Sequence, residues 1–132
     1  MSGETTLITE TAGIHEANAN DSLMVIQHRS MDFNGVKTGF YKDNELTNEI
    51  PDHSETPNIT LNYFFHKSGE LDLETAILLP TYHNGETTLP VLLDPYGGPH
   101  AQRVRKARGL FGVSQWFADQ GFAVVITDGR GT

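Results

Sequence analysis

A tyrosine followed by two glycines is the first group of residues that could carry chemistry. Segment 89–100 reads LPVLLDPYGGPH, so an apolar stretch leads into Tyr96, Gly97 and Gly98. A phenolic O–H can donate to an oxygen that becomes negative during a reaction. Glycines can adopt backbone angles closed to other residues and let another group approach closely. Because the same residues also occur in ordinary turns, the pattern alone leaves both interpretations open.

A second loop of charged residues and glycines follows another apolar stretch. Segment 122–131 reads FAVVITDGRG and ends in Asp128, Gly129, Arg130 and Gly131. Arg130 could bind a carboxylate through two parallel hydrogen bonds. The alternative is a structural ion pair with Asp128 or another acid, and the sequence alone favours this alternative.

A nucleophile motif of the α/β-hydrolase type is absent from the sequence. Such a serine stands in Gly-x-Ser-x-Gly and is followed along the chain by Asp and then His. The nearest segment in the 132 residues, GVSQW at 112–116, lacks the second glycine. It also falls within an expected helix, so we assign Ser114 no nucleophilic role.

Composition excludes several other classes of site and partner. The chain has no cysteine and no His pair at zinc-motif spacing, so we expect neither a metal nor a cofactor. A net charge of −8 argues against a nucleic-acid partner. The basic cluster Arg103, Arg105, Lys106 and Arg108 is expected to be a solvated loop, with an acidic partner surface as the alternative. His100 is expected to be a turn residue near the site.

Neither a membrane span nor a signal peptide is predicted. No stretch approaches about 18 consecutive apolar residues, which is the length of a membrane-spanning helix. The N-terminus lacks the basic and apolar regions of a secretory signal. The compartment therefore stays unassigned, although a native N-terminus would favour the cytoplasm.

Residues 1–50 are expected to form four short antiparallel strands, which resemble one blade of a β-propeller. Turn signals at Asn20-Asp21 and Asn34-Gly35 separate them, the Asn-Gly pair being typical of a hairpin. Residues 51–58 are polar and contain two prolines, and are expected to form a linker. The three strands with assigned bounds are 5–9, 22–27 and 36–41.

Residues 59–132 are expected to open an α/β fold. A strand at 89–93 ending at Asp94, a glycine-rich loop, a helix over 109–120 and a strand at 122–127 form a βαβ unit. Gly121 fits the C′ position after the helix. The apolar strands imply a parallel sheet covered on both faces, yet this chain should leave several apolar faces without helices. Two further strands are expected at 59–66 and 71–79, with Ser68-Gly69 as the turn.

The two motifs, their order and their separation resemble the start of the catalytic domain in prolyl oligopeptidase family serine peptidases. LLDPYGGP and VITDGRG are most similar to the dipeptidyl peptidase IV branch. The resemblance covers residues 59–132, and residues 1–50 are compatible with the last propeller blade of that family. It implies a fragment that joins the end of the propeller to a truncated α/β-hydrolase domain.

The resemblance implies roles for the two loops. Tyr96 would supply an oxyanion-hole donor, while Gly97, Gly98 and Asp128–Gly131 would shape the site. The parent protein would cleave peptides through an acyl-enzyme. The resemblance leaves open whether the parent is a homo-oligomer. The chain itself would be inactive because the Ser, Asp and His of the triad are missing.

Two alternatives remain open from the sequence. The chain could be a non-enzymatic interaction module, in which an open sheet edge after 122–127 favours association. It could also be a truncated esterase or lipase, although those enzymes place His-Gly-Gly-Gly where this chain has Tyr-Gly-Gly-Pro.

Overall fold

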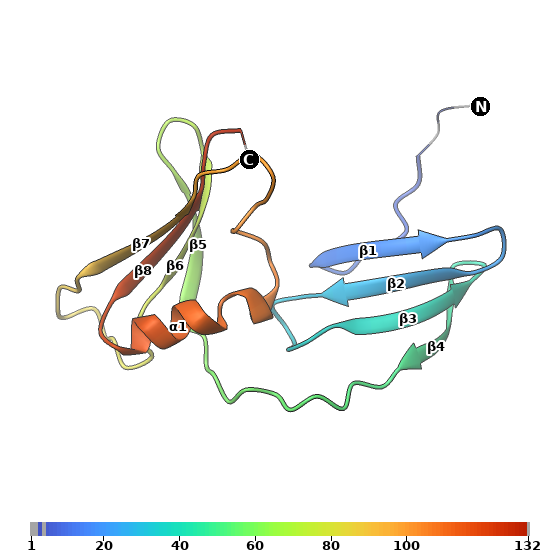
Figure 1. Ribbon diagram of the computed structural model, residues 1–132, viewed down its shortest axis with the longest axis horizontal. Helices are drawn as coiled ribbons and strands as arrows, with labels where there is room; N and C mark the ends of the chain where they lie inside the picture. The colour runs from blue at the N-terminus through green and yellow to red at the C-terminus, as the bar shows by residue number, and fades with distance from the viewer. Residues whose placement is uncertain (1–2, 4, 132) are drawn as a thin grey trace. The chain divides into compact units, whose positions relative to one another are not determined.

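The computed structural model describes residues 3 and 5–131, and within them eight strands form two four-stranded sheets (Figure 1). The chain divides into two compact units. The first contains residues up to Thr56 together with Lys106–Arg108, and the second contains Pro57–Arg105 and residues from Gly109 onward. Each unit is described by itself below.

The first unit is an antiparallel meander whose strands pair in chain order, β1-β2-β3-β4. A two-residue turn, Asp43-Asn44, joins β3 to β4, and both residues have positive φ angles of 51° and 65°. A type I′ hairpin turn requires positive φ at both central positions, and Asp and Asn tolerate it better than most residues. The strands are β1 (Ile14–Ala19), β2 (Met24–Arg29), β3 (Lys37–Lys42) and β4 (Glu45–Ile50).

Two local predictions for this unit are wrong. Residues 5–9 form no strand, and Leu7 and Ile8 are exposed because no neighbouring strand pairs with them. The first strand lies instead at 14–19, in a segment with no alternating pattern. Asn34-Gly35 does not form a tight hairpin either, since it lies within the longer connection 30–36 between β2 and β3.

Two histidines face each other across β1 and β2. His15 lies directly opposite His28, and their rings stack with centroids 4.1 Å apart and 14° between their planes. Burial and then the charge of His28 lower the pKa of His15 below its ordinary value of 6.5. Both effects favour the neutral imidazole of His15 in the folded chain.

The second unit contains a mixed sheet with the strand order β5-β6-β8-β7. β7 and β8 are parallel, as the βαβ pattern predicts, whereas β5, β6 and β8 pair antiparallel. β8 is an inner strand, so the prediction of an open edge there is wrong and the edges are β5 and β7. The strands are β5 (Tyr63–Ser68), β6 (Leu73–Leu78), β7 (Val91–Tyr96) and β8 (Ala123–Asp128).

One α-helix among the described residues, α1 (Gly112–Asp119), connects β7 to β8 and follows a short 3-10 helix at Arg108–Leu110. It is shorter than the predicted 109–120. Gly121 has φ 103° and its N–H donates to the Ala118 carbonyl, which confirms the helix-ending role. No helix of the described residues is long and apolar enough to cross a membrane.

A buried glutamine fastens α1 to the ends of the neighbouring strands. Gln115 is fully buried, and its Oε1 accepts the Asn62 N–H at 2.9 Å. Its Nε2 donates to the Leu79 carbonyl at 3.0 Å and to Asp119 Oδ1 at 3.1 Å. Because every polar atom has a partner, this side chain holds the helix at a fixed position on the sheet.

The helix covers one face of the sheet and leaves the other uncovered within the described chain. The covered face holds the buried core side chains Leu78, Val124 and Ile126 with Phe111 and Ala118. On the opposite face, cross-strand partners form an apolar row consisting of Phe64, Ile77, Val125 and Leu93. Phe64 is 47% exposed and Leu93 67%. The prediction of a sheet covered on both faces is therefore wrong for the described chain. The prediction that an apolar sheet face lacks a covering helix is confirmed.

Candidate functional site

The two motif loops begin at the same end of the parallel pair β7–β8. Tyr96 and Asp128 are the last residues of their strands and lie directly opposite each other in the register. Side chains two residues apart on a strand share a face, so Asp94 lies on the same face as Tyr96. The fold thus brings together the Tyr96 phenol and the carboxylates of Asp94 and Asp128. The two glycine-containing loops start directly after Tyr96 and Asp128.

Tyr96 belongs to the strand rather than to the turn. The sequence predicts a strand over 89–93, but β7 runs from Val91 to Tyr96 and includes Pro95. Pro95 is tolerated because β7 is an edge strand, where a missing N–H costs less than in the sheet centre. Tyr96 is half-buried, and its hydroxyl makes none of the hydrogen bonds found among residues 3 and 5–131.

Gly98 approaches the Tyr96 hydroxyl closely. A Cβ atom on Gly98 would lie 2.8 Å from the Tyr96 oxygen, whereas a Cβ on Gly97 would meet nothing within 4 Å. Neither glycine has a positive φ angle. A positive φ angle is therefore not the reason for a glycine at either position, and close approach to Tyr96 applies to Gly98 alone.

Asp128 has a partner that the sequence did not indicate. Its side chain is buried, and its Oδ1 accepts the backbone N–H of Arg103 at 2.7 Å and that of Val104 at 3.3 Å. The expected ion pair between Asp128 and Arg130 is wrong, since none of the ion pairs among the described residues includes Arg130. Arg130 and Gly131 are exposed and Gly129 is half-buried.

Arg103 is held at its side chain as well. Its guanidinium pairs with Asp94, which lies two residues before Tyr96 on β7. In the first unit, Arg108 donates from Nε to Asn34 at 3.1 Å and from its backbone N–H to the Ser30 carbonyl at 2.9 Å. The prediction of a solvated basic loop is therefore wrong for Arg103 and Arg108.

A hollow of about 490 Å³ lies between α1 and β7. Ser114 contributes to its wall, is 6% exposed and lies inside α1 with no strand leading into it. This position is incompatible with a nucleophile elbow. The wall also includes Leu92, Asp94, Arg103, Val113 and Phe117.

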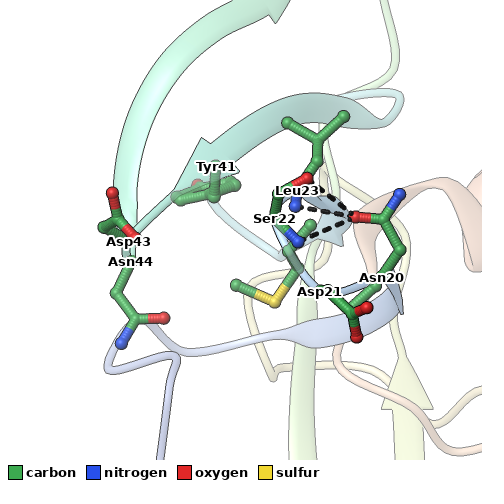
Figure 2. A pocket seen from close by; sticks show the side chains of 9 residues that line it. Asn20, Asp21, Ser22, Leu23, Tyr41, Asp43 and Asn44 are labelled. Atoms are coloured by element: carbon green, nitrogen blue, oxygen red, sulfur yellow. Dashed lines mark hydrogen bonds between the residues drawn. The ribbon is translucent and has the colours of Figure 1, made fainter.

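A second hollow, of about 240 Å³, lies in the first unit and is lined by residues of the β1–β2 and β3–β4 turns (Figure 2). Asn20 Oδ1 accepts the N–H groups of Ser22 and Leu23 at 3.0 and 2.9 Å, so this side chain holds the turn itself. The hollow contains none of the residues expected to act in catalysis. His100 lies in a separate exposed depression with Arg105.

A metal site is not found among the described residues, where no group of three or more His, Asp or Glu side chains converges. The geometry beyond β7 and β8 offers instead a half-buried phenolic O–H and a loop that two carboxylates hold. Such an arrangement can donate a hydrogen bond to an oxyanion.

Two curated proteins with similar sequences are named as prolyl endopeptidases. The chain is 32% identical over 63 residues to the human "Prolyl endopeptidase FAP", and 30% identical over 66 residues to the bovine protein. These matches cover 48% and 50% of the chain. They span 8% and 9% of the relatives' own length. No family model matches the chain.

Solved structures share the fold. Dipeptidyl peptidase 4 from Porphyromonas gingivalis superposes over 98% of the chain with a TM-score of 0.79 and 21% identity, and the match covers 20% of that protein. An acylaminoacyl peptidase from Pyrococcus horikoshii superposes over the whole chain with a TM-score of 0.58 and 19% identity, covering 22% of that protein.

The fold thus matches a portion of dipeptidyl peptidase 4-like proteins, and the motif-based resemblance is confirmed. The chain is similar to serine peptidases of the prolyl oligopeptidase family, in particular its dipeptidyl peptidase IV-like branch. It spans less than a tenth of the curated relatives and about a fifth of the solved structures.

Proposed function

We propose that the chain is the section of a dipeptidyl peptidase IV-like serine peptidase that carries its oxyanion-hole tyrosine. The observation that carries the proposal is Tyr96 at the carboxyl end of a parallel strand, with its hydroxyl unengaged by the described residues and facing Gly98. Functional loops of open α/β sheets lie beyond this end. A preorganised O–H at a developing oxyanion can lower the barrier by about 3 kcal/mol.

The proposal also gives a role to each of the other segments of the chain. Residues 59–132 would begin the α/β-hydrolase domain, residues 51–58 would link it, and residues 1–50 would be the last propeller blade. Gly97 and Gly98 would shape the site with Asp128–Gly131. The whole protein would bind a peptide and cleave it through an acyl-enzyme whose serine, aspartate and histidine lie outside this chain. The isolated chain would therefore be inactive.

A non-enzymatic interaction module is a second candidate, and the apolar row favours it. Phe64 and Leu93 expose large apolar side chains on one face of the sheet, as protein-binding surfaces often do. The esterase alternative has less support, because Tyr-Gly-Gly-Pro ends β7 in place of His-Gly-Gly-Gly.

An activity assay separates the candidates. The 132-residue chain and the complete reading frame that encodes it would each be given a chromogenic Xaa-Pro dipeptide substrate and an active-site serine probe. We expect turnover and labelling from the complete protein alone. If the complete protein contains no reactive serine, the peptidase proposal fails and the interaction module remains.

A further inference from the structure

The loop after Tyr96 returns to the strand end from which it leaves. Tyr96 begins it, and Arg103 and Val104 close it by donating their backbone N–H groups to Asp128, the residue directly opposite Tyr96. The loop between these points is residues 97–102. The buried Asp128 carboxylate thus holds the end of the loop, at Arg103 and Val104, beside its beginning at Tyr96.

Arg103 is held at both of its ends. Its backbone N–H donates to Asp128 on β8, and its guanidinium pairs with Asp94 on β7. Hydrogen bonds to ionised carboxylates are shorter and stronger than those between neutral groups. Two strands therefore hold one loop residue, which restricts both its translation and its rotation.

Between these anchors the loop approaches Tyr96 at Gly98. A Cβ atom at position 98 would lie 2.8 Å from the Tyr96 oxygen. A displacement of the loop would leave the phenol free to change its χ1 and χ2 angles. A coupling between order in the loop and orientation of the phenol would therefore act through Gly98.

We propose that Asp128 and Asp94 are positioning residues for Tyr96, acting through Arg103 as a clasp that closes loop 97–102. The clasp here means Asp94, Arg103 and Asp128. This inference deepens the proposed function and rests on it for its catalytic meaning. Its structural part, the coupling of Asp128 to the Tyr96 phenol, can be tested without any activity.

The first test follows the loop in the 132-residue chain. Asp128→Ala removes both backbone hydrogen bonds, and amide exchange at Arg103 and Val104 should rise about tenfold or more, as expected for loss of a bond to a charged group. Asp128→Asn keeps an acceptor oxygen and should restore much of the protection. Glu74→Ala is the matched control, because it removes a carboxylate of the same sheet that pairs with Lys67 and holds no loop.

The second readout follows the phenol itself. With 3-fluorotyrosine in the chain, the Tyr96 fluorine signal is assigned by its loss in Tyr96→Phe. Asp128→Ala should shift or broaden that signal and leave the other tyrosine signals in place. Arg103→Ala, which keeps the backbone bonds to Asp128, should produce a smaller change of the same kind. If Asp128→Ala does not fold, judged by circular dichroism, Asp128→Asn and Arg103→Ala carry the test.

The outcomes separate this inference from the proposed function. Protected Arg103 and Val104 amides and an unmoved Tyr96 signal in the variants would overturn the clasp, even if Tyr96→Phe slows the complete enzyme. Altered exchange and a moved Tyr96 signal would uphold the coupling. If Tyr96→Phe then left turnover unchanged, the oxyanion role alone would fail. If both hold, Asp128→Ala in the complete enzyme should lower kcat about tenfold with little change in KM.

Discussion

Tyr96 lies directly opposite Asp128 at the ends of two parallel strands, and these residues begin the two motif loops. Tyr96 offers a phenolic O–H, while Asp128 binds the backbone of the loop that follows Tyr96. The Asp128 carboxylate therefore binds the loop that follows Tyr96 and does not pair with Arg130. This relationship makes the two motifs one structural unit.

Removing the Tyr96 hydroxyl should slow the chemical step of the complete enzyme. Loss of one oxyanion donor typically lowers kcat by about 10²–10³-fold, so Tyr96→Phe should show a loss of that size with KM nearly unchanged. Steady-state kinetics on an Xaa-Pro substrate would measure it. Tyr82→Phe, at an exposed loop position, serves as the control and should retain full activity. A Tyr96→Phe enzyme as fast as the wild type would contradict the assignment.

The two adjacent glycines should respond differently to alanine. A Cβ at position 98 would press on the Tyr96 hydroxyl at 2.8 Å, and a misplacement of a catalytic group by about 1 Å can cost up to 10²-fold. Gly98→Ala should therefore lower kcat by about tenfold or more. A Cβ at position 97 would meet nothing within 4 Å, so Gly97→Ala should lower kcat much less than Gly98→Ala does. Equal losses in the two variants would show that close approach to Tyr96 is not the cause.

Truncating Gln115 should destabilise the second unit. Gln115→Ala leaves the Asn62 N–H and the Leu79 carbonyl without their partner, which should lower the free energy of unfolding by about 2–4 kcal/mol. Urea denaturation followed by circular dichroism would measure the change. Gln120→Ala, at an exposed position, should change stability by less than about 0.5 kcal/mol. A loss below 1 kcal/mol in Gln115→Ala would argue against this anchoring role.

The His15–His28 stack should make the first unit less stable in mild acid. Because the pKa of His15 is lowered from 6.5 in the folded chain, the unfolded chain binds a proton more readily. Stability is therefore fully present above pH 6.5 and falls as the pH drops through 6.5 towards the lowered folded value.

His15→Gln should flatten this dependence, whereas His66→Gln, on the other sheet, should keep it. Thermal melts across the pH range from 7.5 down to about 5 would measure both variants, covering the range in which histidine charge changes. An unchanged slope in His15→Gln would assign the acid sensitivity to other groups.

The sequence predicted the elements with strong apolar patterns better than the others. FAVVIT and LPVLL indicated a parallel pair, and Gly121 indicated where the helix ends. Residues 14–19 were missed because β1 has no alternating pattern and its pairing with β2 selects it. The Thr5–Thr9 segment has β-branched residues but no pairing strand, so propensity gave the wrong element.

The candidate site was predictable in its residue types but not in its contacts. The sequence points to Tyr96 and Asp128 because each follows an apolar stretch. It predicts a solvated Arg103, because a cluster of basic residues does not show which side chain reaches Asp94. The register that sets Asp128 opposite Tyr96 depends on pairing between segments that are distant in the chain, and one sequence does not reveal it.

The apolar row has a practical consequence for anyone handling this chain. Phe64 and Leu93 offer a binding surface to hydrophobic fluorescent dyes while the sheet is still intact. Such dyes are commonly used to report partly folded states with exposed apolar surface. The folded chain should itself be bright with dye and lose fluorescence on melting, so a dye-based melt would run in the opposite direction to the usual one.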